Sequence, residues 1–298
     1  MPYIRLQNKK IYCEEYGCGK HPTLVYLHGG PGESCLTYTH QAQVLGEYFH
    51  FISFDQYGVF RSDSLPANER AGVRYHVDLL EEMRLVLGIE RWIPLGHSFG
   101  GMLAVIYAHT YPASIDAVIY DCPMWSALHT ARTIAERVLP YYQQHGEAEK
   151  IALCEEILGA EITPRSAFEK SLQLEMHEEL MRFCHAIEMT DYQAYLDSYL
   201  TDPNVPEDCW YRYTSFTQKL LAEDDFYEDY LPYLAEIEKP QLLIVGEYDM
   251  TCGENQQQFF CEHAPVGKRV ILRDSAHLSW MQQPEQYTET IREFAERI

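Results

Sequence analysis

Three short stretches of the chain contain residue types that together can perform nucleophilic chemistry. Ser98 lies in GHSFGG, Asp249 ends GEYD, and His277 ends SAH. A serine hydroxyl is a weak nucleophile at neutral pH and needs a general base. A histidine base in turn needs a carboxylate that fixes its tautomer and stabilises its charged form. The three residues therefore predict a catalytic triad in the chain order serine, acid, histidine.

The neighbours of Ser98 indicate how such a nucleophile is presented. The apolar run WIPL precedes GHSFGG and the apolar run MLAVIYA follows it, which predicts a strand, a sharp turn and a helix. A serine at this turn has its hydroxyl lifted above the sheet. Gly96 and Gly100 permit the tight turn and the close strand-to-helix packing. Because a lone G-x-S-x-G also occurs in ordinary glycine-rich loops, the other motifs decide the interpretation.

The elements that must position these residues are short apolar strands separated by helical stretches. Runs of this kind, covered on both faces, are typical of a parallel sheet. Asp249 and His277 each follow such a run, so parallel strands deliver them to the same carboxyl edge as Ser98. A two-strand hairpin over residues 2–16 is predicted at the sheet edge, and the buried strands are predicted at 23–30, 49–55, 115–121, 241–246 and 268–274.

A long stretch without strand-like runs interrupts this alternation. Residues 124–238 consist of amphipathic helical segments, so we divide the chain into a core of 1–123 and 239–298 and a helical cap of 124–238. The cap contains 23 Asp and Glu but 8 Lys and Arg, a net of 15 negative charges. Solvated helix faces are the preferred explanation, and a few carboxylates lining a pocket for a cation are the alternative.

Composition narrows the partners and the compartment. The net charge of −22 disfavours nucleic acid and anionic membranes, so we expect a small-molecule or short-peptide substrate. The nine cysteines form no C-x-x-C, and no H-E-x-x-H occurs. Because a triad mechanism requires neither a metal nor an organic cofactor, none is expected. No apolar signal or membrane-spanning run is present, which predicts a cytoplasmic protein. The oligomeric state has no signature in the sequence.

The motifs taken together resemble a known family. HGGPG at 28–32, followed by GHSFGG, GEYD and SAH, is similar to the α/β-hydrolase fold, a mostly parallel central sheet flanked by helices with an inserted helical cap. Within that fold, HGGPG followed by DQYGVFRS at 55–62 resembles the proline iminopeptidase group, whose stretches read HGGPG and DQRGxGxS.

This resemblance implies an activity and further site residues. The implied enzyme is an aminopeptidase that releases a small N-terminal residue through an acyl-enzyme. The implied oxyanion donors are the backbone amides of Gly30 and Phe99, because acyl transfer needs donors that are fixed in advance. Gly29 and Asp121 are expected near the substrate, whereas His28 is expected to brace the loop. No metal or other cofactor is implied.

Two acidic residues outside the triad need separate interpretations. Asp121 ends the strand IDAVIYD at the catalytic edge, and some members of the fold take their acid from that strand, so it rivals Asp249 as the triad acid. Asp249 is preferred because its position before His277 follows the usual order. Asp55 and Arg61 are expected to form a structural ion pair or a loop brace rather than to act in catalysis, because surface-loop charges commonly do so.

The sequence also departs from the proline iminopeptidase pattern. The usual elbow is GGSWGG, whereas here His97 and Phe99 flank the serine; Tyr57 replaces an arginine and Phe60 a glycine. That family binds the substrate amine with cap glutamates, and no motif locates them here. The candidates are Glu175, Glu178 and Glu179, or Glu207 with Asp208. A carboxylesterase, a lactonase or a related small-molecule hydrolase is the alternative activity, and a non-catalytic hydrolase-like binding protein is a third hypothesis.

Overall fold

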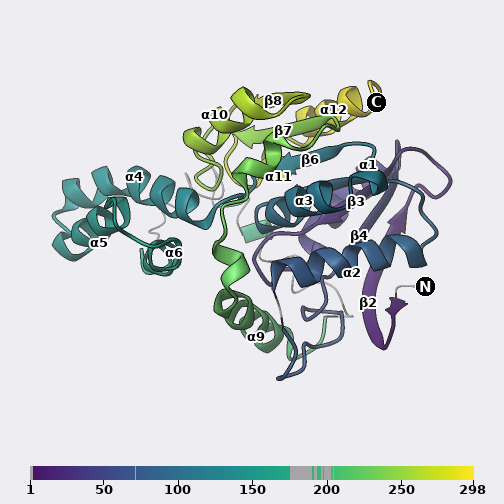
Figure 1. The fold of residues 1–298 in the computed structure, drawn as a ribbon, viewed down its shortest axis with the longest axis horizontal. Helices are drawn as coiled ribbons and strands as arrows, with labels where there is room; N and C mark the ends of the chain where they lie inside the picture. The colour runs from purple at the N-terminus through teal and green to yellow at the C-terminus, as the bar shows by residue number, and fades with distance from the viewer. Residues whose placement is uncertain are drawn as a thin grey trace.

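The apolar runs form one eight-stranded sheet at the centre of the protein (Figure 1). A computed structural model describes residues 3–70, 72–174, 190, 193–195, 197, 203 and 205–298. The strand order is β1-β2-β4-β3-β5-β6-β7-β8. The bounds are β1 Tyr3–Leu6, β2 Lys9–Tyr16, β3 Thr23–Leu27, β4 His50–Phe54, β5 Ile93–His97, β6 Val118–Asp121, β7 Gln241–Gly246 and β8 Gly267–Leu272.

The parallel strands in the centre of the sheet are buried, as is typical of parallel sheets covered on both faces. From β4 to β8 every neighbouring pair is parallel, and the central strands β3, β5, β6 and β7 are buried at every residue. The hairpin of β1 and β2 adds two antiparallel strands at one edge. Strand β8 lies at the other edge, where alternate residues are exposed. The prediction of a mostly parallel sheet flanked by helices is confirmed.

Helices cover both faces of the sheet. Helix α3 packs against β5 and β6 and contacts α2, whereas α1 packs against β4 and contacts α12. Residues Phe99 to Ala108 of α3 are all buried, because this helix lies between the sheet on one side and α2 with neighbouring segments on the other. The helices that pack around the sheet are α1 Thr39–Gly46, α2 Val73–Val86, α3 Phe99–Thr110, α10 Glu254–His263, α11 Ser279–Gln282 and α12 Pro284–Ala295.

The described parts of the segment between β6 and β7 form helices beside the sheet (Figure 1). Those with described bounds are α4 Ala127–His145, α5 Ala148–Leu158, α6 Pro164–Ser171 and α9 Cys209–Ala222. Helices α4, α5 and α6 bury a small apolar cluster of their own around Val138, Tyr142 and Ile157. Because apolar helix stripes need a partner to cover them, these three helices stabilise one another. The division into core and cap remains a prediction.

Two further observations concern the length of the helices and the state of the cysteines. Within the described ranges, no helix is both long and apolar enough to cross a bilayer. Cys18 and Cys261 are exposed free thiols, and six other described cysteines are buried free thiols. The thiols of Cys13, Cys35, Cys122 and Cys252 have pKa values raised by burial, as expected for thiols that serve as packing groups.

Candidate active site

Ser98 occupies the sharp turn between β5 and α3. Its backbone has φ 54° and ψ −119°, a conformation that side-chain-bearing residues rarely adopt. A Cβ on Gly96 would lie 2.2 Å from the carbonyl oxygen of Gly100, and one on Gly100 would lie 2.0 Å from that of Leu27. Only glycine fits at either position, so the sequence around Ser98 dictates the turn that presents its hydroxyl.

His277 and Asp249 come from the loops that follow β8 and β7. Nδ1 of His277 lies 2.6 Å from Oδ1 of Asp249, and the amide of Cys252 donates to Oδ2 of Asp249 at 2.7 Å. Burial alone lowers the pKa of His277, but the charge and hydrogen bond of Asp249 outweigh it and raise the pKa above the ordinary 6.5. This arrangement holds the imidazole by Nδ1 and leaves Nε2 for another partner.

Asp121 forms a second histidine–aspartate pair. Its Oδ2 lies 3.1 Å from Nδ1 of His97, and it accepts hydrogen bonds from Ser279 Oγ at 2.6 Å and Tyr287 OH at 3.4 Å. Asp121 is fully buried. Its carboxylate contacts His97, and Asp121 is not among the described residues that line the candidate substrate pocket, where the sequence predicts it. As the rival acid it faces His97, whereas Asp249 faces His277.

The HGGPG loop is fixed by the side chain of His28. Burial lowers the pKa of His28 to about 4, so the ring is neutral. Its Nε2 accepts from the amide of Gln56 at 3.0 Å, and Nδ1 lies 3.0 Å from the carbonyl oxygen of Gly29. One acceptor and one donor satisfy both nitrogens of a neutral ring. These contacts agree with the expected bracing of the loop by His28.

The Gly30 and Phe99 amides come from different elements. Gly30 has φ +114° and lines the same pocket as Ser98, and Phe99 is the first residue of α3, where helix amides lack an intrahelical partner. Gly29 packs beneath Ser98, since a Cβ there would lie 3.1 Å from that of the serine. The expected oxyanion donors and the expected substrate contact thus lie around Ser98, and their functions remain predictions.

Asp55 and Arg61 form the expected ion pair, but in the interior. Both side chains are fully buried, and Nε of Arg61 lies 2.7 Å from Oδ2 of Asp55. The predicted surface location is wrong, because both side chains are buried. Ser34 Oγ and the amide of Cys35 also donate to this carboxylate. Burial alone raises the pKa of Asp55, and Arg61 outweighs it and holds the pKa below its usual range. The pair anchors the segment that follows HGGPG.

Two of the departures from the family pattern, Tyr57 and Phe60, lie between Asp55 and Arg61 in the sequence. Phe60, in the place of a glycine, keeps a left-handed backbone with φ 38° and is fully buried. Its carbonyl oxygen accepts from Nη1 of Arg212 on α9 at 3.0 Å. Tyr57, in the place of an arginine, donates its hydroxyl to Glu69 at 2.9 Å. The loop therefore keeps the glycine-like turn although a phenylalanine occupies it.

A pocket of about 270 Å³ lies beside Ser98 and His277. Ser98, His277 and His97 line it from the sheet edge, while α4 and α6 line the other side. Glu33 also lines it. The sequence does not predict this location, although Glu33 is a charged residue directly after HGGPG. The remaining lining residues are Gly30, Met124, Thr130, Ile134, Phe168, Ser171, Leu172, Leu174, Tyr195, Thr251 and Leu278.

The cap carboxylates considered for amine binding are elsewhere or outside the described residues. Glu207 and Asp208 are exposed at the start of α9, and Asp208 pairs with Arg212 at 2.9 Å. Glu175, Glu178 and Glu179 lie outside the described residues. Among the described residues that line the pocket, Glu33 is the one carboxylate.

Cys122 lies beside the His277–Asp249 pair. The three potential ligand atoms lie within 4.8 Å of one another. Burial raises the pKa of the Cys122 thiol well above its ordinary value, and its sulfur accepts from the amide of Gly246 and donates to the carbonyl oxygen of Ala276. A metal ligand must be a thiolate, so these residues suit proton transfer better than metal binding.

Comparison with known proteins gives the same fold. The α/β-hydrolase fold family matches residues 22–152. The chain is similar to the proline iminopeptidase of Saccharolobus solfataricus, at 25% identity over 99% of this chain and 92% of the relative. It is similar to that of Heyndrickxia coagulans, at 24% identity over 94% of this chain and 92% of the relative. A solved proline iminopeptidase-related protein from Thermus thermophilus has a TM-score of 0.78 and 23% identity, covering 99% of this chain and 96% of that one. The chain therefore has the α/β-hydrolase fold and resembles proline iminopeptidases.

Proposed function

We propose that the protein is a serine hydrolase that removes a small N-terminal residue from a short peptide or amide. The observation that carries the hydrolase chemistry is the shared pocket of Ser98 and His277, with His277 held by Asp249. Nε2 of His277 takes the proton of Ser98 as the hydroxyl attacks the carbonyl carbon. The Gly30 and Phe99 amides bind the oxyanion.

The same base completes the reaction. His277 passes its proton to the departing amine, and the acyl group stays on Ser98 as an ester. Water, deprotonated by His277, then attacks that ester and releases the acid, which restores the Ser98 hydroxyl. Asp249 stays ionised throughout and stabilises the imidazolium that forms in each half-reaction.

Glu33 supports a substrate with a free amine. A Cβ on Gly29 would lie 3.1 Å from Ser98 Cβ and 3.5 Å from Glu33 Oε2, so the carboxylate and the nucleophile border the same small space. In an N-terminal residue the ammonium is two bonds from the carbonyl carbon that the serine attacks, and must therefore lie close to the nucleophile. A desolvated ammonium needs a carboxylate partner, and Glu33 is placed to supply one.

The rest of the pocket supports a small apolar side chain on the released residue. Met124, Phe168 and Leu278 are buried and line the pocket. Ile134 on α4 and Leu174 after α6 extend this apolar surface. Apolar walls with a few convergent polar groups are the usual composition of a small-molecule site. Proline, alanine or leucine at the N-terminus of the substrate suits this lining.

The test compares prolyl and alanyl arylamides, with the amine free or blocked, and short-chain aryl esters. We expect cleavage of the free-amine arylamides, abolished in Ser98→Ala without loss of the folded circular dichroism spectrum. Glu33→Gln is expected to raise KM for these substrates roughly 10- to 100-fold, whereas Glu207→Gln, on the exposed start of α9, leaves KM unchanged.

Each alternative gives a different pattern. Equal cleavage of free and blocked arylamides would contradict the amine requirement while keeping the serine hydrolase assignment. Ester cleavage without arylamide cleavage would identify an esterase or lactonase. Hydrolysis at wild-type rate by Ser98→Ala would remove Ser98 as the nucleophile.

A further inference from the structure

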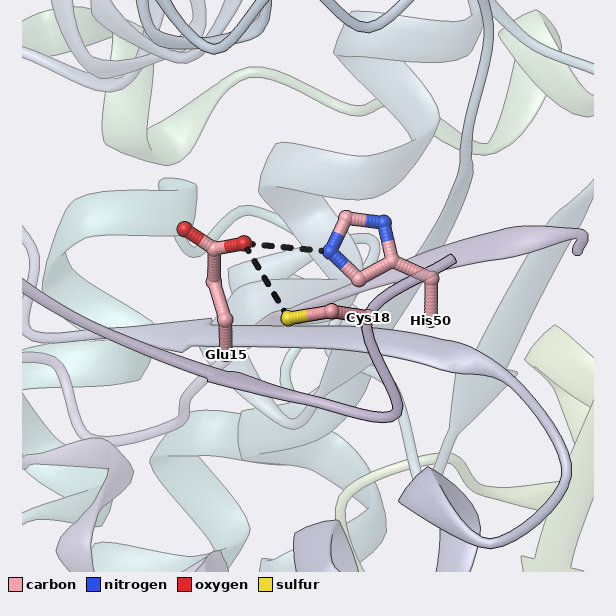
Figure 2. A group of neighbouring side chains, drawn as sticks. All are labelled: Glu15, Cys18 and His50. Carbon is pink, nitrogen blue, oxygen red and sulfur yellow. Dashed lines mark hydrogen bonds and ion pairs between the residues drawn. The ribbon is translucent and has the colours of Figure 1, made fainter. Parts of the chain in front are cut away.

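Three potential metal ligands meet at the end of the sheet opposite the active site. Glu15 lies near the end of β2, Cys18 in the turn after it, and His50 at the start of β4 (Figure 2). Oε2 of Glu15 lies 3.2 Å from Nε2 of His50 and 3.9 Å from Sγ of Cys18. Strands β4 and β5 run in the same direction. The start of β4 therefore lies at the amino ends of the parallel strands, whereas Ser98, which follows the end of β5, lies at their carboxyl ends.

The register of the sheet brings Glu15 and His50 together. Glu15 pairs with Ile52 in the antiparallel ladder of β2 and β4. His50 is two residues before Ile52, so its side chain emerges on the same face. Thr23 pairs with His50 in the parallel ladder of β3 and β4, and its Oγ1 lies 3.1 Å from Nδ1 of the imidazole.

The turn that bears Cys18 is fixed by close packing. Gly17 has φ +61°, and a Cβ there would lie 2.2 Å from the carbonyl oxygens of Gly46 and Phe49. The amide of Lys20 donates to the carbonyl oxygen of Gly17 at 3.1 Å, and Lys20 Nζ donates to the carbonyl oxygens of Gly46 and Glu47. The turn is thereby held against the segment that leads into His50, so Cys18 is positioned in advance.

We propose that Glu15, Cys18 and His50 bind a zinc-like divalent metal ion. Tetrahedral zinc with its usual bond lengths separates an oxygen and a nitrogen ligand by about 3.4 Å, and a sulfur and an oxygen ligand by about 3.6 Å. The observed 3.2 and 3.9 Å lie close to these values, and all three ligand atoms lie within 4.8 Å of one another. A thiolate and an imidazole select zinc, cobalt or copper over magnesium and calcium, and water supplies the fourth ligand.

Thr23 completes the site by orienting His50. When its hydroxyl oxygen accepts a hydrogen bond from Nδ1–H, the lone pair of Nε2 is available to the metal, which is the arrangement found around metal-bound histidines. Binding replaces the contact between Nε2–H of His50 and Glu15. The Nε2 proton passes to Nδ1 if the ring is neutral, or to solvent if it is an imidazolium, and the thiol proton of Cys18 is released to solvent. The metal ties the β2–β3 turn to β4, so it stabilises the fold rather than taking part in hydrolysis.

The test uses the full-length protein without a histidine tag, kept reduced, and titrated with Co²⁺ and then Zn²⁺. We expect one Co²⁺ per chain, with a thiolate-to-cobalt charge-transfer band that Zn²⁺ removes, and a higher midpoint of thermal unfolding with Zn²⁺. Cys18→Ser abolishes the charge-transfer band, and Cys261→Ser, at the other exposed thiol among the described residues, retains it.

Two further variants separate ligation from folding. His50→Gln is expected to abolish tight binding, and Thr23→Val to weaken Zn²⁺ binding by about 10- to 100-fold, while the metal-free proteins unfold at temperatures close to wild type. A wild-type protein without the cobalt band would overturn the proposal. So would a band that persists in Cys18→Ser, or one that disappears in Cys122→Ser instead, which would place the metal beside His277.

Discussion

Two histidine–aspartate pairs lie beside the same serine, and they differ in what else their carboxylates bind. The rings of His97 and His277 lie 4.6 Å apart between centroids. Asp249 forms a hydrogen bond with His277 at 2.6 Å and accepts one further hydrogen bond, from the backbone amide of Cys252. Asp121 bonds His97 at 3.1 Å and also accepts from two hydroxyl groups.

This difference suits the His277–Asp249 pair to proton transfer and the His97–Asp121 pair to stabilising the fold around the serine. A carboxylate that concentrates its charge on one imidazole stabilises the imidazolium, and it raises the pKa of His277. The carboxylate of Asp121 is shared among His97, Ser279 and Tyr287, which belong to β5, α11 and α12. It thereby holds the elbow strand against the C-terminal helices. Proximity to the nucleophile does not by itself identify the triad acid.

The largest expected effect is that of Asp249→Asn. The amide retains the shape but favours the wrong tautomer of His277, so we expect kcat to fall about 10⁴-fold, as for the corresponding change in serine proteases. Steady-state kinetics on the arylamides that the wild type cleaves would measure it. If Asp121→Asn lowered kcat more than Asp249→Asn does, the two pairs would have to exchange their proposed functions.

Asp121→Asn is expected to act mainly on stability. The buried hydroxyl donors of Ser279 and Tyr287 lose part of their acceptor, so the free energy of unfolding falls by about 1–3 kcal/mol, while kcat stays within about tenfold of wild type. Urea denaturation and steady-state kinetics of the same preparation separate the two quantities. A variant with unchanged stability would show that this network does not support the elbow.

The smallest expected effect is on the pH dependence. His277 must be deprotonated to act as a base, so kcat/KM rises with pH, with a midpoint above the ordinary 6.5 because the pKa of His277 is raised. Asp249, Asp121 and Glu33 all contribute negative charge that raises it. Removing one charge in Glu33→Gln moves the midpoint to lower pH, and Glu207→Gln leaves it in place. A midpoint that stays fixed in Glu33→Gln would place the carboxylate too far from His277 to act on it.

The parts of the site that follow from chain order could be predicted from the sequence. Parallel strands deliver the residues after their carboxyl ends to one edge, so Ser98, Asp249 and His277 could be placed there from their positions after apolar runs. The sharp turn at Ser98 followed from its glycine neighbours, because no side chain fits at those positions.

The parts that depend on side-chain direction and register could not be predicted. Asp121 also ends a strand at that edge, but which imidazole it faces depends on how β6 packs beside β5. Glu33 enters the pocket through the path of the loop after HGGPG, and the contact of Glu15 with His50 depends on the pairing of β2 with β4. Such pairings join residues far apart in sequence, and local patterns do not encode them.

The most direct test of the central claim is covalent labelling of the nucleophile. An aryl phosphonate probe reacts with a serine only when a base activates it, and intact-protein mass spectrometry with peptide mapping locates the adduct. We predict one phosphonyl group on Ser98 of the wild type, none on Ser98→Ala, and a rate of labelling that falls far more in Asp249→Asn than in Asp121→Asn. Labelling of another residue, or equal rates in the two aspartate variants, would contradict the proposed triad of Ser98, His277 and Asp249.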